Sequence, residues 1–89
     1  MSDVSAAEVR SFLLHHIHDQ VLASGLSPQE LSDDFDLLAT GTIDSMGLIE
    51  LLSALEDRFG VTADLGELDT EDIGLIGPFC EHIAHRARS

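Results

Sequence analysis

Residues 41–60, GTIDSMGLIELLSALEDRFG, decide the fold because they describe one amphipathic helix together with both of its ends. Asp44 is a favoured N-cap residue and Gly60 a favoured C-terminal stop, so the stretch predicts a helix over residues 45–59. Leucines and one phenylalanine recur every three or four residues and predict a stripe that faces a core. That stripe consists of Leu48, Leu51, Leu52, Leu55 and Phe59.

Two other apolar side chains of this helix are expected to be exposed. Met46 and Ile49 follow a second line along the helix, away from the leucine stripe. Ser45 stands beside them in the first turn. A serine at this position usually serves only as a cap, but exposed apolar neighbours indicate a surface that other proteins recognise.

Upstream, the sequence predicts one long helix and then a long loop. The capping box SAAE at residues 5–8 starts the helix, and Gly25 is the expected stop. The helix carries an apolar stripe of Val9, Phe12, Leu13, Ile17 and Val21. Residues 27–44 show no sustained period and contain a proline and several acids, which is typical of a loop with one helical turn at most.

Downstream, two more helices are expected. Asp69 and Gly74 bracket a helix of one or two turns, and a last helix is expected to start near Pro78. This last helix should bury Ile76, Phe79 and Ile83. The sequence therefore predicts an all-α four-helix bundle with a long first loop and a short third helix, formed by a single domain over residues 1–89.

Composition limits the classes of partner. The 89 residues carry a formal charge of −13, and most of the acids lie in residues 30–72. Such a surface repels nucleic acid and anionic lipid and attracts basic protein surfaces, although acidity also serves solubility alone. No signal peptide or membrane-spanning run is apparent, and the single cysteine, Cys80, excludes an internal disulfide. We expect a cytoplasmic monomer.

Residue types argue against several kinds of catalysis. The chain has no lysine, which rules out Schiff-base chemistry and a Walker-type phosphate loop. A hydrolase elbow around Ser45 would need glycine where Ile43 stands. Histidine pairs occur at residues 15 and 18 and at residues 82 and 85, but no third ligand follows at a recognisable spacing. Neither a catalytic nor a metal site is predicted.

With these residues in view, GTIDSMGLIELLSALEDRFGV resembles the signature of the acyl carrier protein family. The resemblance covers the whole chain, because the four-helix pattern with a long first loop is that family's fold. It implies that Ser45 receives 4′-phosphopantetheine from coenzyme A through a phosphopantetheinyl transferase, with Asp44 in a supporting role. The protein would then carry a substrate as a thioester and would not itself be an enzyme.

The resemblance also implies a partner-binding helix. An apolar centre gives contact area, and the charges around it give steering and orientation. The matching positions are Met46, Ile49, Glu50, Glu56 and Asp57. Ser53 follows the line of Met46 and Ile49 and is expected to take part, as is Arg58, although Arg58 departs from the acidic character usual at its position. The expected partners are an adenylating ligase and an acyltransferase or ketosynthase, each with a basic docking surface.

The subclass is less closely defined. The segment that ends at Ser45, GTIDS, is unlike the glycine-rich segment before the serine in carrier domains of large peptide synthetases. The segment DSMG is similar to that of D-alanyl carriers and of free-standing carriers of bacterial secondary metabolism. We expect a stand-alone acyl or aminoacyl carrier of polyketide or nonribosomal-peptide type. The alternatives are a fatty-acid or D-alanyl carrier of primary metabolism, and an unmodified helical module for protein interaction.

Overall fold

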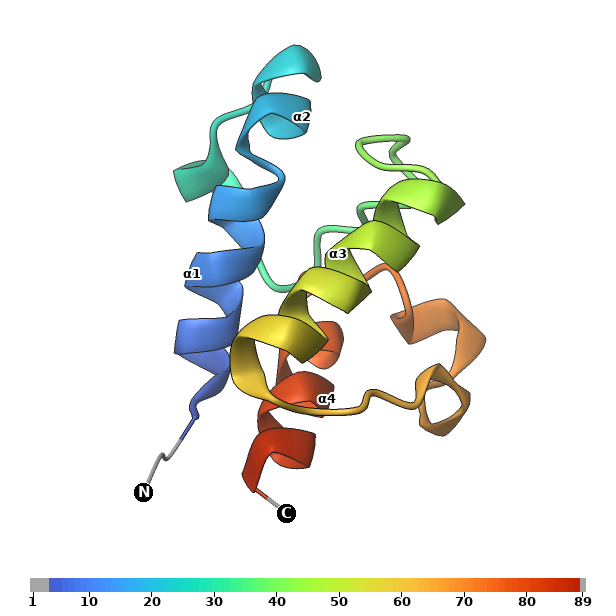
Figure 1. The fold of residues 1–89 in the computed structure, drawn as a ribbon. Coiled ribbons are helices and arrows are strands. Elements are labelled where there is room, and N and C mark those ends of the chain that lie inside the picture. Colours follow the sequence, from blue (N-terminus) through green and yellow to red (C-terminus); the bar gives the residue numbers. More distant parts are fainter. Residues whose placement is uncertain (1–3, 89) are drawn as a thin grey trace.

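The structure is a computed structural model that describes residues 4–88. Figure 1 shows its helices arranged around one core. The elements are α1 (Ala6–His16), α2 (His18–Ala23), α3 (Ser45–Phe59) and α4 (Ile76–Arg88), with the 3-10 turns η1 (Pro28–Glu30), η2 (Leu65–Glu67) and η3 (Thr70–Asp72). Within residues 4–88 no strand forms, and the extended pairing is limited to an isolated bridge between Asp36 and Leu75. The prediction of an all-α bundle is confirmed.

The predicted first helix is wrong in one respect, because it is divided at Ile17. This residue has φ −101° and ψ 17°, so α1 and α2 form in place of one helix. Residues 15–19, HHIHD, all have modest helix propensity, which weakens the helix at this point. Ile17 is nevertheless buried, and its carbonyl accepts a hydrogen bond from the Val21 N–H at 3.0 Å. The apolar stripe therefore continues across the break.

α3 has the predicted bounds and the predicted caps. The Asp44 side chain accepts from a first-turn amide, and Gly60 ends the helix in the left-handed region at φ 65°. The leucine stripe is confirmed at its centre, since Leu48, Leu51 and Leu55 are buried. Leu52 and Phe59 are only partly buried and pack at the edge of the core.

The long first loop, residues 24–44, is anchored at several points. Its apolar side chains Leu31, Leu37 and Ile43 are buried in the core. The Leu37 N–H donates to the Gly74 carbonyl at 2.8 Å, which ties the loop to the segment before α4. A loop fixed in this way holds the start of α3 in place.

The predicted short third helix is replaced by η3, a single 3-10 turn. The Asp72 N–H donates to the Asp69 carbonyl at 2.8 Å, and Gly74 lies only two residues further on, so the turn is not extended into an α-helix.

α4 begins at Ile76, two residues before the predicted start at Pro78. The Gly77 N–H donates to the Asp33 carbonyl at 2.9 Å, and a β-carbon at Gly77 would lie 2.7 Å from the Asp33 β-carbon. Because Gly77 has no side chain, the loop can lie directly against the helix start. The predicted burial of Ile76, Phe79 and Ile83 is confirmed.

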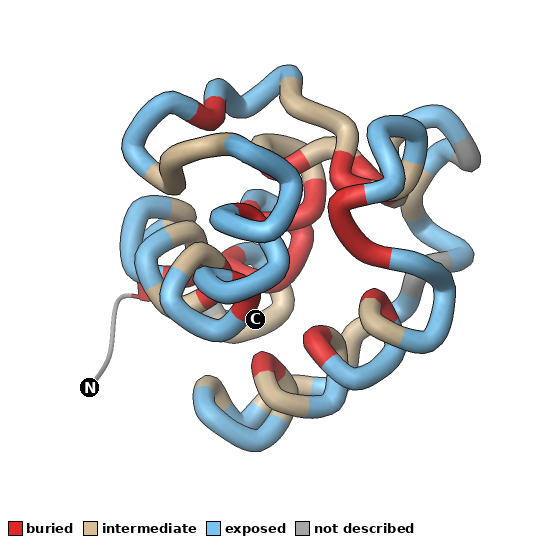
Figure 2. Tube along the Cα trace, turned by 90° about the horizontal axis from the view of Figure 1, so that it is seen from above, coloured by how far each residue is buried: buried red, intermediate tan, exposed pale blue. Residues whose placement is uncertain are grey.

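The core lies where α1 packs against both α3 and α4. Figure 2 shows the buried residues on the inner sides of the helices and the exposed residues around the outside. The segment between α3 and α4 is held to α4 by His82, whose Nε2 accepts from the Asp64 N–H at 3.1 Å. None of the helices in residues 4–88 is both long enough and apolar enough to cross a membrane.

Candidate functional site

The start of α3 is built around the Asp44 side chain. Its Oδ1 accepts from the Gly47 N–H at 2.7 Å, which satisfies one of the amides that a helix leaves unpaired at this end. A β-carbon at Gly47 would lie 3.3 Å from both Asp44 Oδ1 and the Ile43 β-carbon. Glycine at this position therefore gives the capping carboxylate room to approach.

Ser45 is the first residue of α3 and is exposed. None of the hydrogen bonds formed within residues 4–88 involves its hydroxyl. A serine at such a position often caps the helix itself, but here Asp44 is the cap, as the sequence predicts. The hydroxyl is thus unengaged and stands at the positive end of the helix dipole, where a phosphate group is stabilised.

Hydrogen bonds hold the loop before α3 in place. The Ile43 N–H donates to the Leu37 carbonyl at 3.1 Å, and the hydroxyls of Thr40 and Thr42 lie 2.9 Å apart. Gly41 takes a positive φ of 75°, which lets the chain turn into these contacts. The position of Ser45 is therefore fixed by the loop as well as by the helix.

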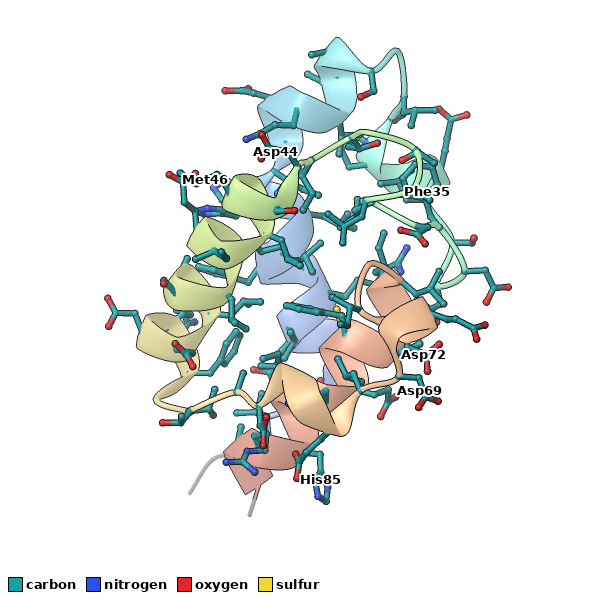
Figure 3. All side chains as sticks on the ribbon, turned by 90° about the vertical axis from the view of Figure 1, so that its right-hand side faces the viewer. Phe35, Asp44, Met46, Asp69, Asp72 and His85 are labelled. Atoms are coloured by element: carbon teal, nitrogen blue, oxygen red, sulfur yellow. The ribbon has the colours of Figure 1, made fainter. Side chains whose placement is uncertain are left out.

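The outer side of α3 carries the exposed apolar pair that the sequence predicts. The Met46 side chain is 70% exposed and Ile49 is 59% exposed. Figure 3 shows Met46 at the start of α3, close to Asp44. Single exposed apolar residues are common on monomers, but two that are adjacent on one helix face offer contact area to a partner.

The remaining predicted partner-binding residues differ in their surroundings. Glu50, Ser53 and Asp57 are exposed beside the apolar pair. Glu56 is partly buried, and its Oε2 accepts from the Ala63 N–H at 2.9 Å, so it also holds the chain that follows α3. The Arg58 guanidinium lies 5.2 Å from the centre of the Phe59 ring. A docking role for these residues stays a prediction.

Sequence reasoning missed a cleft beside Ser45. α2 brings Gln20 opposite Met46 and Glu50, and the space between them has a volume of about 400 Å³. No sequence signal placed Gln20 there, because its position depends on the break at Ile17. Among the described residues, no group of three or more His, Cys, Asp or Glu side chains is arranged to hold a metal ion.

Comparison with known proteins gives matches to one family model and to several curated relatives. The family model described as the phosphopantetheine attachment site matches residues 22–76. A D-alanyl carrier protein of Streptococcus suis is 49% identical over 39 residues, which are 44% of this chain and 49% of the relative. Those of Bacillus velezensis and Lacticaseibacillus rhamnosus are 41% and 44% identical over 39 residues, again 44% of this chain and 50% and 48% of the relatives.

The chain spans about half the length of the curated relatives it matches. No solved structure matches it.

Proposed function

Because this chain belongs to the family that carries a phosphopantetheine attachment site, we propose that Ser45 is the attachment residue and that the cargo is a D-alanyl group. Members of this family are carrier proteins that tether a substrate on covalent 4′-phosphopantetheine and are not themselves catalysts. The residue and the cargo are the parts that we propose.

The exposed, unengaged hydroxyl of Ser45 supports the site assignment most directly. It lies inside the matched range, residues 22–76, at the first position of α3. A phosphodiester there would meet the positive helix end, and Asp44 would keep the first turn closed beside it. The residues present therefore fit the group. The terminal thiol of the phosphopantetheine group supplies the thioester bond to the substrate.

The relatives favour a D-alanyl cargo over the polyketide or nonribosomal-peptide pathway expected from sequence. Each of the three relatives described above is named a D-alanyl carrier protein. The partners we propose are accordingly a phosphopantetheinyl transferase and an adenylating ligase that activates D-alanine. Both would meet the acidic outer side of α3, which is suited to a basic surface on the enzyme.

Loading of the modified protein tests the cargo. Protein that carries phosphopantetheine is incubated with ATP, D-alanine and a D-alanine ligase, and intact mass is recorded. We expect the mass of one D-alanyl group to appear, and hydroxylamine to remove it because it is a thioester. Loading with fatty acyl or malonyl groups by their own enzymes, without any loading by D-alanine, would overturn the D-alanyl proposal.

A thiol titration separates the attached arm from the protein's own cysteine. Burial raises the pKa of the Cys80 thiol to about 12; Arg10 opposes this shift, while Asp33 and Glu81 add to it. At pH 8 Cys80 is therefore protonated, and it is also 2% exposed. We expect iodoacetamide to leave the unmodified native protein unlabelled and to label the modified protein once, at the arm.

Cys80 should become reactive when the protein is denatured. In the unfolded chain the thiol returns to its ordinary pKa of 9.0, so its raised pKa in the folded state also predicts that stability falls as pH rises from about 9. Rapid labelling of Cys80 in the native protein at pH 8 would contradict the burial shown by the structure.

A further inference from the structure

His82 is a buried, titratable side chain that has no part in the carrier chemistry described above. It is 8% exposed and contacts the segment that joins α3 to α4 (Figure 1). Its Nε2 atom accepts a hydrogen bond from the Asp64 N–H at 3.1 Å. A ring nitrogen can accept only when it carries no proton, so the ring here is neutral and its one proton is on Nδ1. The contact therefore exists in only one protonation state of the histidine.

Protonation of His82 would remove this contact. An imidazolium carries a proton on both nitrogens, so its Nε2–H and the Asp64 N–H would be two donors that face each other. The charge would also be poorly solvated, because the His82 side chain is only 6% exposed. The Asp64 amide would lose its acceptor and would have to move away from the ring to bond with water.

The charges beside the ring do not compensate for this loss. Glu67 Oε1 lies 3.8 Å from His82 Nδ1, but it also lies 3.5 Å from Arg86 Nη1, and the Glu67 side chain is half exposed. An ion pair with so exposed a partner contributes little. The Asp64 carboxylate accepts from the Gly66 N–H at 2.9 Å and is engaged within its own turn.

The titratable groups of the neighbouring elements are engaged elsewhere or do not bond to the ring. On α3, Glu56 accepts from the Ala63 N–H at 2.9 Å. On α1, Arg10 is paired with Asp33 of the first loop. Among the described residues, no hydrogen bond or ion pair joins His82 to the other titratable side chains of α1, η3 and α4, which are Glu8, His15, His16, Asp69, Glu71, Asp72, Cys80, Glu81 and His85.

A second bond between α4 and the segment does not depend on the histidine. Arg86 Nε donates to the Thr62 carbonyl at 2.9 Å. Arginine stays charged over the whole pH range in which a histidine titrates, so this bond is kept. Loss of the His82 contact therefore frees the residues after Thr62 and leaves the segment attached there. Leu68, which packs against the core from a partly buried position, is the apolar contact that such a movement would loosen.

We propose that His82 is a pH-sensitive contact that holds residues 64–68 against α4 at neutral pH and releases them in weak acid. A histidine ordinarily changes its charge between about pH 5 and 8, so the change falls in a range that proteins encounter. The direction follows from the geometry, because only the neutral ring accepts from Asp64. The opening is local, since the buried Phe79 and Ile83 of α4 do not titrate. The inference does not rest on the carrier function.

Hydrogen exchange of the Asp64 amide, measured by nuclear magnetic resonance on the full chain, tests this contact. Protection factors are compared at about pH 7.5 and about pH 5.5, since a histidine titrates between them. Protection of Asp64 should fall by about three- to tenfold in weak acid, as expected for the loss of one hydrogen bond. Protection of the Leu51 amide, inside α3, should not change. The nitrogen signals of the His82 ring should titrate together with the loss at Asp64.

Two glutamine variants locate the effect. His82→Gln keeps a side-chain acceptor but does not titrate, so the protection of Asp64 should no longer depend on pH. His85→Gln makes the same change at an exposed histidine of the same helix, one turn further on, and should leave the pH response as it is in the wild type.

Several results would overturn the proposal. These are equal protection of Asp64 at both pH values in the wild type, an equal fall in His82→Gln, or a neutral ring that carries its proton on Nε2. A loss of protection at every amide, Leu51 included, would also overturn it, because the whole bundle would then unfold. None of these results bears on modification at Ser45, so the carrier proposal is tested separately.

Discussion

Ser45→Ala should gain no mass when it is incubated with coenzyme A and a phosphopantetheinyl transferase, whereas the wild type gains one phosphopantetheine. The reason is chemical, because alanine has no oxygen to form the phosphodiester. Without the phosphopantetheine arm, no ligase should load a substrate on this variant. The change removes an exposed hydroxyl that bonds to nothing within residues 4–88, so we expect stability to change by less than about 0.5 kcal/mol.

Ser53→Ala is the matched control for this result. Ser53 is also an exposed serine of α3 and lies two turns further along the helix. This variant should be modified to completion, as the wild type is. Modification of Ser45→Ala would refute the site, and a wild type that stays unmodified beside a modified control carrier would leave the unmodified interaction module as the better description.

The features of α3 that could be predicted from sequence are those set by local chemistry. Asp44 and Gly60 define the ends of the helix by capping, and their geometry needs no distant contact. The exposure of Met46 and Ile49 follows from helical spacing once the leucine stripe is known. The candidate attachment site lies wholly within this stretch, which is why it could be predicted from the sequence.

The features that could not be predicted depend on contacts distant in sequence. α4 starts early because Gly77 meets Asp33 of the first loop. Glu56 fits a docking position by spacing, yet it bonds the Ala63 amide across the turn that follows α3. The cleft at Gln20 requires both the break in the first helix and the position of α2 across from the start of α3. Spacing along one segment carries none of this information.

Leu55→Ala should have the largest effect on stability. Leu55 is 0% exposed at the centre of the α3 stripe, so its truncation removes buried apolar surface and leaves a cavity. We expect the free energy of unfolding to fall by about 2–5 kcal/mol. A domain of this size has roughly 5–13 kcal/mol in total, so much of its stability would be lost. Urea unfolding followed by far-ultraviolet circular dichroism measures the change, since the chain has no Trp or Tyr for fluorescence.

Leu22→Ala makes the same chemical change at a position that is 51% exposed, and it should alter stability by less than about 0.5 kcal/mol. The pair distinguishes a leucine that holds the bundle together from one that lies at the surface. If Leu55→Ala proved as stable as the wild type, α3 would not be packed on the core as the structure shows. If Leu22→Ala were strongly destabilised, Leu22 would be buried more deeply than the structure shows.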